Sequence, residues 1–109
     1  MVSRKRWAYE CILMHDEVPQ FEPFAEDGYI GFRGYVRGKK TGRLYRVTIR
    51  ASIDTYPHYM PQVFVEPRCG GHWLADGSLC VVKRWSATNT FANHLMTAIK
   101  YIEEHDYGY

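Results

Sequence analysis

Long hydrophobic runs are missing from this sequence of 109 residues. No apolar stretch approaches the ~18 to 20 residues that a helix needs to span a bilayer. The basic residues at 1–6 are followed by Trp7, Glu10 and His15, whereas a secretion signal would continue with an apolar segment. We therefore expect a cytoplasmic protein that does not enter a membrane.

Repeats, low-complexity stretches and Ser/Gly-rich linkers are also missing. The composition, 46% hydrophobic and 24% charged residues, resembles that of an ordinary globular domain and excludes a disordered or collagen-like chain. A chain of this length buries roughly two thirds of its surface on folding, so one core suffices without obligatory metals or disulfides. We expect a single domain over residues 1–109.

Cysteine is scarce. The three cysteines, Cys11, Cys69 and Cys80, are odd in number and irregularly spaced. This excludes a secreted disulfide framework and predicts three free thiols.

The charge excess is small as well. The net charge of +2 is too low to indicate nucleic-acid binding by itself. The cations are nevertheless clustered, because residues 33–50 contain seven of them and no acidic residue: Arg33, Arg37, Lys39, Lys40, Arg43, Arg46 and Arg50.

Both ends of the chain have the spacing of amphipathic helices. Over 3–16, behind a possible Ser3 cap, the apolar face consists of Trp7, Cys11 and Met14. After a cap at Thr88 or Thr90, the apolar face of a second helix consists of Phe91, Leu95, Ile99 and Ile102.

Between these helices, apolar and polar residues alternate over 30–37 and 45–53 on either side of a Gly-containing turn, which predicts a β-hairpin. A short β-branched run at 62–66 predicts a third strand, whereas the prolines in 18–24 predict a connector. This meander would place four arginines together on the face opposite the core: Arg33, Arg37, Arg46 and Arg50. Residues 69–89 have no periodicity, and so long an irregular stretch is usually functional.

This order of elements, with its motifs, resembles the ubiquitin-conjugating enzyme (UBC-like) family over nearly the whole chain. The matching motifs are Tyr-Pro-x-x-Met-Pro at 56–61, Val-Phe-Val-Glu-Pro at 63–67, Gly-Ser-Leu-Cys-Val at 77–81 and Trp-Ser-Ala at 85–87. The resemblance implies an α+β fold with an N-terminal helix, an antiparallel meander, a long active-site loop and a following helix. The two terminal helices of the family would be missing. It also implies that Cys80 accepts a protein C-terminus as a thioester.

One departure concerns the residues before this cysteine. Eukaryotic members have His-Pro-Asn, whereas this chain has His72-Trp73-Leu74, so the oxyanion-stabilising asparagine has no counterpart. The string His-x-x-x-Asp-Gly-Ser-Leu-Cys at 72–80 is more similar to small bacterial relatives, some of which are encoded with cyclic-oligonucleotide synthases in antiphage operons.

Cys80 can be read in two ways from the residues alone. A nucleophilic thiolate needs exposure and a cation, a base or a helix N-terminus nearby, and the loop carries His72, Lys83 and Arg84. Flanked by Leu79 and Val81, Cys80 could instead be a buried core residue. The motif context favours the nucleophile.

The remaining loop residues have supporting roles. His72 is a candidate base or thiolate partner, and it could equally cap a turn. Asp76 precedes Gly77 and predicts an Asx turn. Trp85 and Asn89 support the loop, and a main-chain N–H, Ser78, Asn89 or Asn93 would stabilise the oxyanion. A zinc site built from Cys69, His72, Cys80 and His58 is a weaker alternative, because the spacing matches no strong motif.

The function that this resemblance implies is thioester formation between Cys80 and the C-terminus of a partner, followed by acyl transfer in bacterial antiphage defence. No cofactor is expected. The expected partners are an activating enzyme and a ubiquitin-like protein or nucleotidyltransferase, bound in part by Arg33, Arg37, Arg46 and Arg50; nucleic acid is not favoured. The alternative is a non-catalytic adaptor that binds a protein through its sheet and loop.

Overall fold

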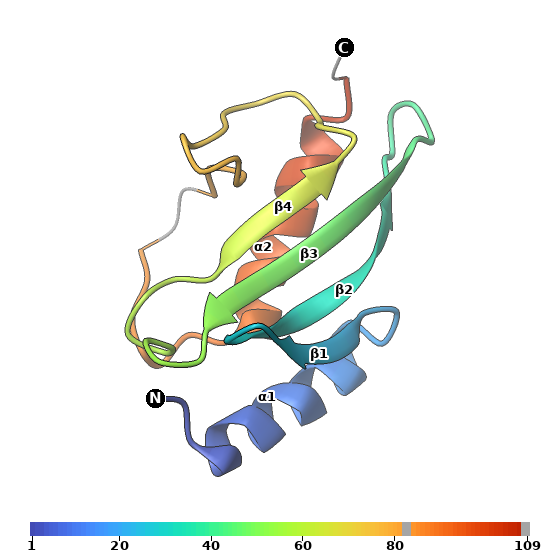
Figure 1. Ribbon diagram of the computed structural model, residues 1–109. Coiled ribbons are helices and arrows are strands. Elements are labelled where there is room, and N and C mark those ends of the chain that lie inside the picture. Colours follow the sequence, from blue (N-terminus) through green and yellow to red (C-terminus); the bar gives the residue numbers. More distant parts are fainter. Residues whose placement is uncertain (82–83, 108–109) are drawn as a thin grey trace.

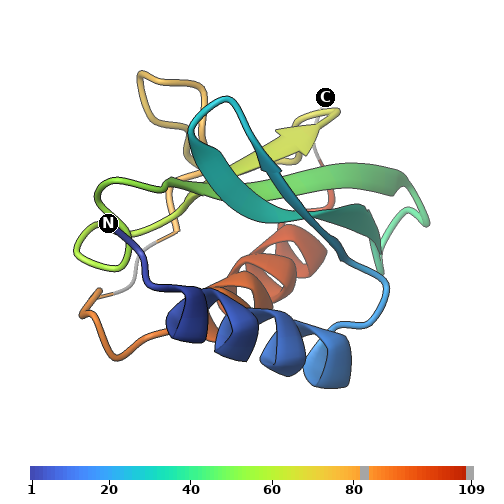
Figure 2. The ribbon, with the colours of Figure 1, turned by 60° about the horizontal axis from the view of Figure 1, so that its bottom comes forward.

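Both helices lie on one face of a single antiparallel sheet (Figures 1 and 2). The computed structural model describes residues 1–81 and 84–107. Its elements are α1 (Arg4–Glu17), β1 (Glu22–Glu26), β2 (Tyr29–Arg37), β3 (Leu44–Ser52), β4 (Gln62–Glu66) and α2 (Phe91–Glu104). The strands follow the sheet order β1-β2-β3-β4, so that each strand pairs with its neighbour in the sequence. This confirms the expected α+β class.

The two predicted helices are present with the predicted caps. The Ser3 side chain accepts a hydrogen bond from the Arg6 N–H at 3.1 Å, and the Thr90 side chain accepts one from the Asn93 N–H at 3.1 Å. Each cap satisfies an amide that has no partner within its helix. Pro19 follows the end of α1 and cannot continue it.

The predicted hairpin is also confirmed. β2 and β3 pair over nine residues, from Tyr29 opposite Ser52 to Arg37 opposite Leu44. β4 pairs with β3 from Gln62 opposite Arg50 to Glu66 opposite Arg46. The alternation of the sequence therefore fixes the register, because a slip of one residue would turn the apolar set to the other face.

The expectation of a connector over 18–24 and of a three-stranded meander is wrong. Residues Glu22–Glu26 form β1, which is joined to β2 by a tight turn with positive φ at Asp27 (54°) and Gly28 (80°). Asp-Gly is suited to such a turn. Pro23 is tolerated because β1 is an edge strand, which needs main-chain hydrogen bonds on one side only.

The core lies between the sheet and α2. Its largest fully buried side chains include Phe32, Tyr45, Ile49, Phe91 and Leu95. The rings of Phe32 and Phe91 meet edge to face at 5.4 Å, and Trp7 of α1 packs on Phe32 at 5.2 Å. These aromatic contacts join the two helices to the sheet.

A buried carboxylate joins the β2–β3 turn to the end of α2. Asp106 accepts hydrogen bonds from the Tyr45 hydroxyl at 2.6 Å, the Thr41 hydroxyl at 2.7 Å and the Lys40 N–H at 3.0 Å. The hydrogen bond from Tyr45 and those from Thr41 and Lys40 lower the pKa of Asp106 to about 2. Gly38 leaves room for this carboxylate, since a Cβ there would lie 2.0 Å from its Oδ2.

Among the described residues, neither helix combines the length and the apolar character that crossing a membrane requires.

Candidate functional site

Cys80 and His72 lie opposite each other in the loop that follows β4. Trp73 and Leu79 form an isolated antiparallel bridge, and the Cys80 N–H donates to the His72 carbonyl at 2.9 Å. Opposed residues of an antiparallel pair have their side chains on the same face. The His72 imidazole and the Cys80 thiol therefore lie on the same face of this loop. Their main chains are joined directly, whereas no hydrogen bond between the two side chains is found in the part of the chain that the structure describes.

An Asx turn closes the tip of the loop, as predicted. Asp76 Oδ1 accepts from the Ser78 N–H at 2.8 Å and from its hydroxyl at 2.6 Å, while Gly77 takes a φ of +89°. The Gln62 side chain donates to Asp76 Oδ2 at 2.8 Å, which ties the turn to β4. The hydrogen bonds from Ser78 lower the pKa of Asp76, so the turn is held by an ionised carboxylate.

This turn removes one of the predicted oxyanion donors. Ser78 is 2% exposed, and its single hydroxyl proton takes part in the hydrogen bond to Asp76. The hydroxyl therefore has no second proton to donate to a developing oxyanion. Ser78 supports the loop by holding the Asx turn, and its expected role as an alternative oxyanion donor is not favoured.

The three thiols have different surroundings. Cys69 is 1% exposed within the core, and burial raises the pKa of its thiol. Cys11 is partly buried on α1, where burial and the neighbouring Glu10 carboxylate raise its thiol pKa. Cys80 is partly exposed on the loop, next to the buried residues Leu79 and Val81. Cys69 and Cys11 are therefore held in the neutral thiol form by their surroundings.

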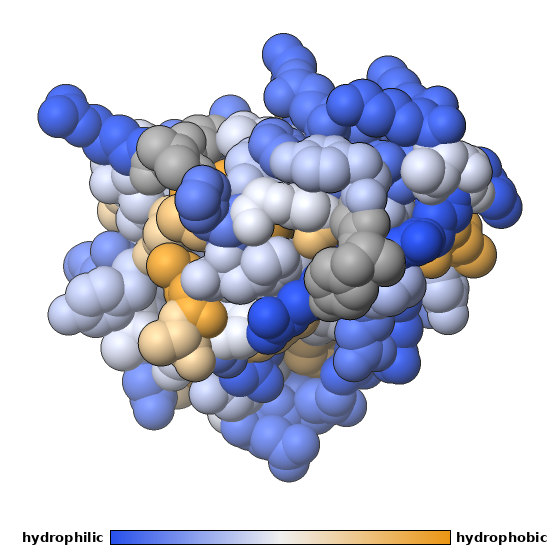
Figure 3. All heavy atoms as spheres, turned by 90° about the horizontal axis from the view of Figure 1, so that it is seen from above, coloured by the Kyte–Doolittle hydropathy of each residue, from blue (hydrophilic) through white to orange (hydrophobic). Residues whose placement is uncertain are grey.

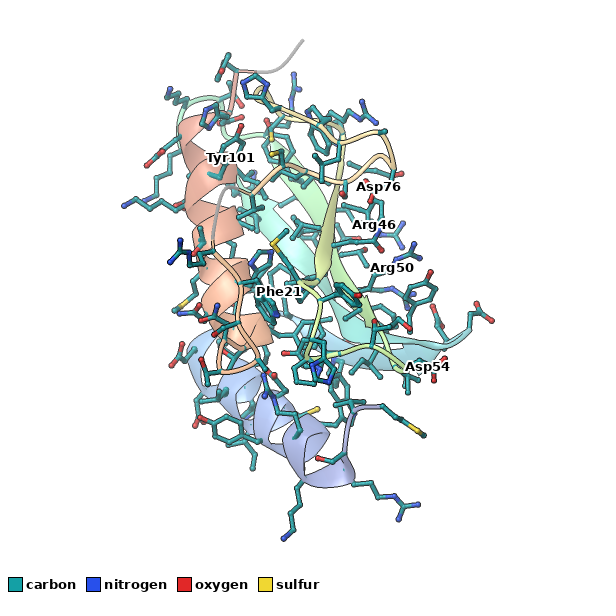
Figure 4. All side chains as sticks on the ribbon, turned by 90° about the vertical axis from the view of Figure 1, so that its left-hand side faces the viewer. Phe21, Arg46, Arg50, Asp54, Asp76 and Tyr101 are labelled. Atoms are coloured by element: carbon teal, nitrogen blue, oxygen red, sulfur yellow. The ribbon has the colours of Figure 1, made fainter. Side chains whose placement is uncertain are left out.

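The C-terminal half of α2 holds the His72 side of the loop. The His72 N–H donates to the Tyr101 hydroxyl at 3.0 Å, and Figure 4 places Tyr101 and the Asp76 turn at the same end of the molecule. Gly71 adopts a φ of +104°, and a Cβ there would lie 2.2 Å from the Tyr101 hydroxyl. A Cβ at Gly70 would lie 2.7 Å from the ring of Tyr107. Sequence analysis did not identify Tyr101; the Gly-Gly pair was the available signal of a close approach.

Trp85 and Asn89 lie in the segment between Cys80 and α2. Lys83, one of the predicted cations, falls outside the described residues. The Trp85 indole donates to the Pro57 carbonyl at 2.8 Å, and the Asn89 side chain donates to the Arg84 carbonyl at 3.2 Å. The first hydrogen bond ties the segment to the turn between β3 and β4, and the second lies within the segment.

A buried carboxylate on α1 fixes the far end of the same segment. Glu10 is 0% exposed and accepts from Arg6 Nε at 2.8 Å, from the Phe91 N–H at 2.9 Å and from the Tyr56 hydroxyl. Arg6 in turn donates to the carbonyls of Ala87, at 2.7 Å, and of Asn89. Because Phe91 is the first residue of α2, the carboxylate also lies at the positive end of that helix dipole.

This cluster around Glu10 was missed from the sequence. Glu10 follows Trp7 by three residues and precedes Met14 by four, which places it on the apolar face of the helix. A carboxylate on that face, four residues after an arginine, was the signal that a buried ion pair was present.

The four predicted arginines share the sheet face that points away from the helices; Figure 4 labels two of them, Arg46 and Arg50. The face is not purely basic, because β1 and β4 add carboxylates opposite the arginines. Arg33 pairs with Glu26, and Arg46 lies opposite Glu66. The expectation of a field without acidic residues holds for the segment 33–50 and is wrong for the folded surface.

Aromatic rings accompany the arginines on this face. The Arg33 guanidinium lies over the ring of Phe24 at 3.9 Å, and that of Arg50 lies 4.0 Å from the ring centre of Tyr29 and 4.9 Å from that of Phe64. These contacts hold Arg33 and Arg50 against the sheet. Arg37, which donates to the Gly42 carbonyl at 2.7 Å, and Arg46 are the more exposed of the four.

The end of the molecule that carries the loop and the C-terminal end of α2 is largely hydrophilic, with only small hydrophobic patches (Figure 3). The zinc alternative finds no geometric support, since the described residues contain no group of three or more His, Cys, Asp or Glu side chains suited to a metal ion. No family model, curated protein or solved structure matches this chain.

Proposed function

We propose that this chain is a UBC-like cysteine acyltransferase of bacterial antiphage defence. In this proposal Cys80 forms a thioester with the C-terminus of a ubiquitin-like protein or a nucleotidyltransferase and passes the acyl group to a nucleophile. The observation that carries it is the placement of Cys80 opposite His72 on a braced, partly exposed loop, while Cys69 is buried in the core and Cys11 packs against that core. The Gly-Ser-Leu-Cys and Trp-Ser motifs and the α+β architecture agree with it.

The reaction has two acyl-transfer steps. The Cys80 thiolate attacks the activated carboxyl carbon of the partner's C-terminus, a C–S bond forms, and the activating group leaves. An amine or other nucleophile then attacks the thioester carbonyl, the C–S bond breaks, and the thiolate leaves and regains a proton. His72 accepts the thiol proton in the first step or stabilises the thiolate. Activation by ATP belongs to a separate or fused activating enzyme.

The oxyanion of each tetrahedral intermediate needs a hydrogen-bond donor. With the Ser78 hydroxyl engaged by Asp76 and the Cys80 N–H engaged by the His72 carbonyl, the candidates are another main-chain N–H, Asn89 and Asn93. The supporting contacts from Tyr101 and Arg6 hold the main chain on both sides of Cys80, which suits a main-chain donor because its position then needs no rearrangement.

A specific observation favours the second candidate function, an adaptor that binds protein through the sheet. The outer face combines arginines with aromatic rings, a composition that is enriched at protein interfaces. Its accessible cations are Arg37 and Arg46. Reversal of both to Glu should weaken partner binding in a salt-dependent manner with little change in melting temperature. Unchanged affinity would exclude these two side chains from the interface.

The thioester is tested by expressing the tagged chain together with its neighbouring genes and separating the proteins on gels with and without reductant. The wild type should carry an adduct that dithiothreitol and hydroxylamine cleave. Cys80→Ser should give either a reductant-resistant ester or no adduct, Cys80→Ala should give none, and His72→Ala should accumulate the adduct more slowly. Cys11→Ser is the matched control and should behave as the wild type. An adduct that survives in Cys80→Ala would refute the proposal.

A further inference from the structure

The outward face of α1 has an unusual pattern. Lys5, Tyr9, Ile12 and Asp16 are spaced at i, i+4, i+7 and i+11, so they lie within an arc of about 60° around the helix. All four are exposed; Tyr9 has 52% and Ile12 has 61% of its surface open to solvent. They point away from Glu10, on the side of α1 that is turned from the core. In Figure 2 this helix runs along the outside of the molecule.

The pattern is antisymmetric about the middle of the helix. Lys5 and Asp16 stand at equal distances from the centre with opposite charges, and Tyr9 and Ile12 stand at equal distances with apolar side chains. Arg4 and Glu17, one residue further out, repeat the same opposition. A helix with this order is complementary to a copy of itself that runs in the opposite direction.

The charges at the two ends of α1 do not stabilise this helix by itself. Basic side chains at a helix N-terminus and acidic ones at its C-terminus oppose the helix dipole. The first turn of α1 contains no acidic residue, and Lys5 and Asp16 have no ion-pair partner within the described chain. This arrangement becomes favourable when the N-terminus of one α1 lies beside the C-terminus of another.

We propose that the Lys5–Tyr9–Ile12–Asp16 face of α1 is a homodimer contact, in which the α1 helices of two copies pack antiparallel across a two-fold axis. Lys5 of each copy then faces Asp16 of the other, and Tyr9 packs on Ile12 at the centre. The contact is isologous, because each residue pair occurs twice. This inference does not depend on the proposed thioester chemistry. It concerns the oligomeric state of the chain.

A groove between α1 and α2 adjoins this face. It runs next to Tyr9, and its lining combines apolar side chains, among them Leu13 and the half-exposed Met96, with polar ones, among them Asn89 and Asn93. A second helix lying along α1 would cover part of this groove. One helix pair buries less than the roughly 1,200 Å² of a standard interface, so the dimer is expected to be weak, concentration-dependent and salt-sensitive.

Charge reversal provides the test, since the two sites face each other only in the antiparallel dimer. Sedimentation equilibrium of the whole chain is compared for the wild type, Lys5→Glu, Asp16→Lys and an equimolar mixture of the two variants. Each variant alone places two pairs of like charges in contact and should dimerise at least about tenfold more weakly. The mixture should recover wild-type affinity, because both contacts of the heterodimer again join opposite charges.

Two further variants complete the design. Ile12→Ala should weaken the dimer at high salt as well as at low salt, whereas Lys100→Glu, an exposed charge on α2, should leave it unchanged. The proposal is overturned if the wild type is monomeric over the whole accessible concentration range, if either reversal leaves the dimer intact, or if the mixture associates no better than the single variants. Binding of another operon protein to α1 of a monomeric wild type would assign the face to that protein and equally overturn it.

Discussion

The replacement of Glu10 tests how firmly α1 holds the segment before α2. In the native state its carboxylate accepts hydrogen bonds from Arg6, the Tyr56 hydroxyl and the Phe91 N–H. Glu10→Ala leaves the Tyr56 and Phe91 donors buried without a partner, at about 1 to 3 kcal/mol each. Arg6 is 22% exposed, so water recovers part of its loss. The two buried donors together amount to ~2 to 6 kcal/mol, and we expect a loss of ~3 to 5 kcal/mol, the range found when other buried pairs are broken.

Glu10→Gln preserves the shape and one acceptor oxygen, and we expect about half of that loss, ~2 kcal/mol. For a domain of this size the melting temperature should fall by roughly 8 °C with Gln and by about 12 to 20 °C with Ala. Circular dichroism melting and urea unfolding give both numbers. Glu17→Gln, an exposed carboxylate on the same helix, is the control and should change stability by less than about 0.5 kcal/mol. Equal effects of Glu10→Gln and Glu17→Gln would refute the reasoning.

Two further predictions concern Asp106 and the thiols. The hydrogen bond from the Tyr45 hydroxyl is the largest of the causes that lower the Asp106 pKa from 3.8 to about 2. The ionised carboxylate therefore contributes its full stabilisation above pH ~4, and this contribution is lost as the pH falls towards 2. Asp106→Asn should therefore melt lower than the wild type at neutral pH, and the gap should shrink between pH ~4 and ~2; a gap independent of pH would contradict this. Brief iodoacetamide treatment with peptide mapping should label Cys80 first, because burial disfavours the thiolates of Cys11 and Cys69; earlier labelling of either would count against the nucleophile.

Elements with local signals could be predicted from the sequence. The helices follow from apolar spacing and caps, and the β2–β3 hairpin follows from alternation around a Gly-containing turn. β1 is hard to predict because proline usually interrupts a strand, although an edge strand accepts it. The Asp-Gly pair at 27–28 is the local hairpin signal for β1 and β2.

The candidate site could also be predicted only in part, because some of its contacts join residues near in the sequence and others join distant ones. The opposition of His72 and Cys80 is a local consequence of the Asx turn at Asp76, which folds the loop 72–80 back on itself. The contacts that support the loop are not local in the sequence. Tyr101 accepts a hydrogen bond from His72, 29 positions earlier, and Glu10 accepts one from Phe91, 81 positions later. Such contacts depend on how α1 and α2 pack, which no pattern within either helix specifies.

Mass spectrometry of the chain, expressed with its neighbouring genes and isolated under non-reducing conditions, tests the central claim most directly. We predict that a fraction of the protein carries a mass increment equal to that of a co-expressed protein, or of its C-terminal peptide after digestion, attached at Cys80 and lost on treatment with dithiothreitol. We also predict that Cys80→Ala abolishes both the increment and the proposed antiphage activity while melting close to the wild type. A Cys80 that never carries a reductant-labile adduct, together with full activity of Cys80→Ala, would contradict the carrier role and leave the adaptor function in its place.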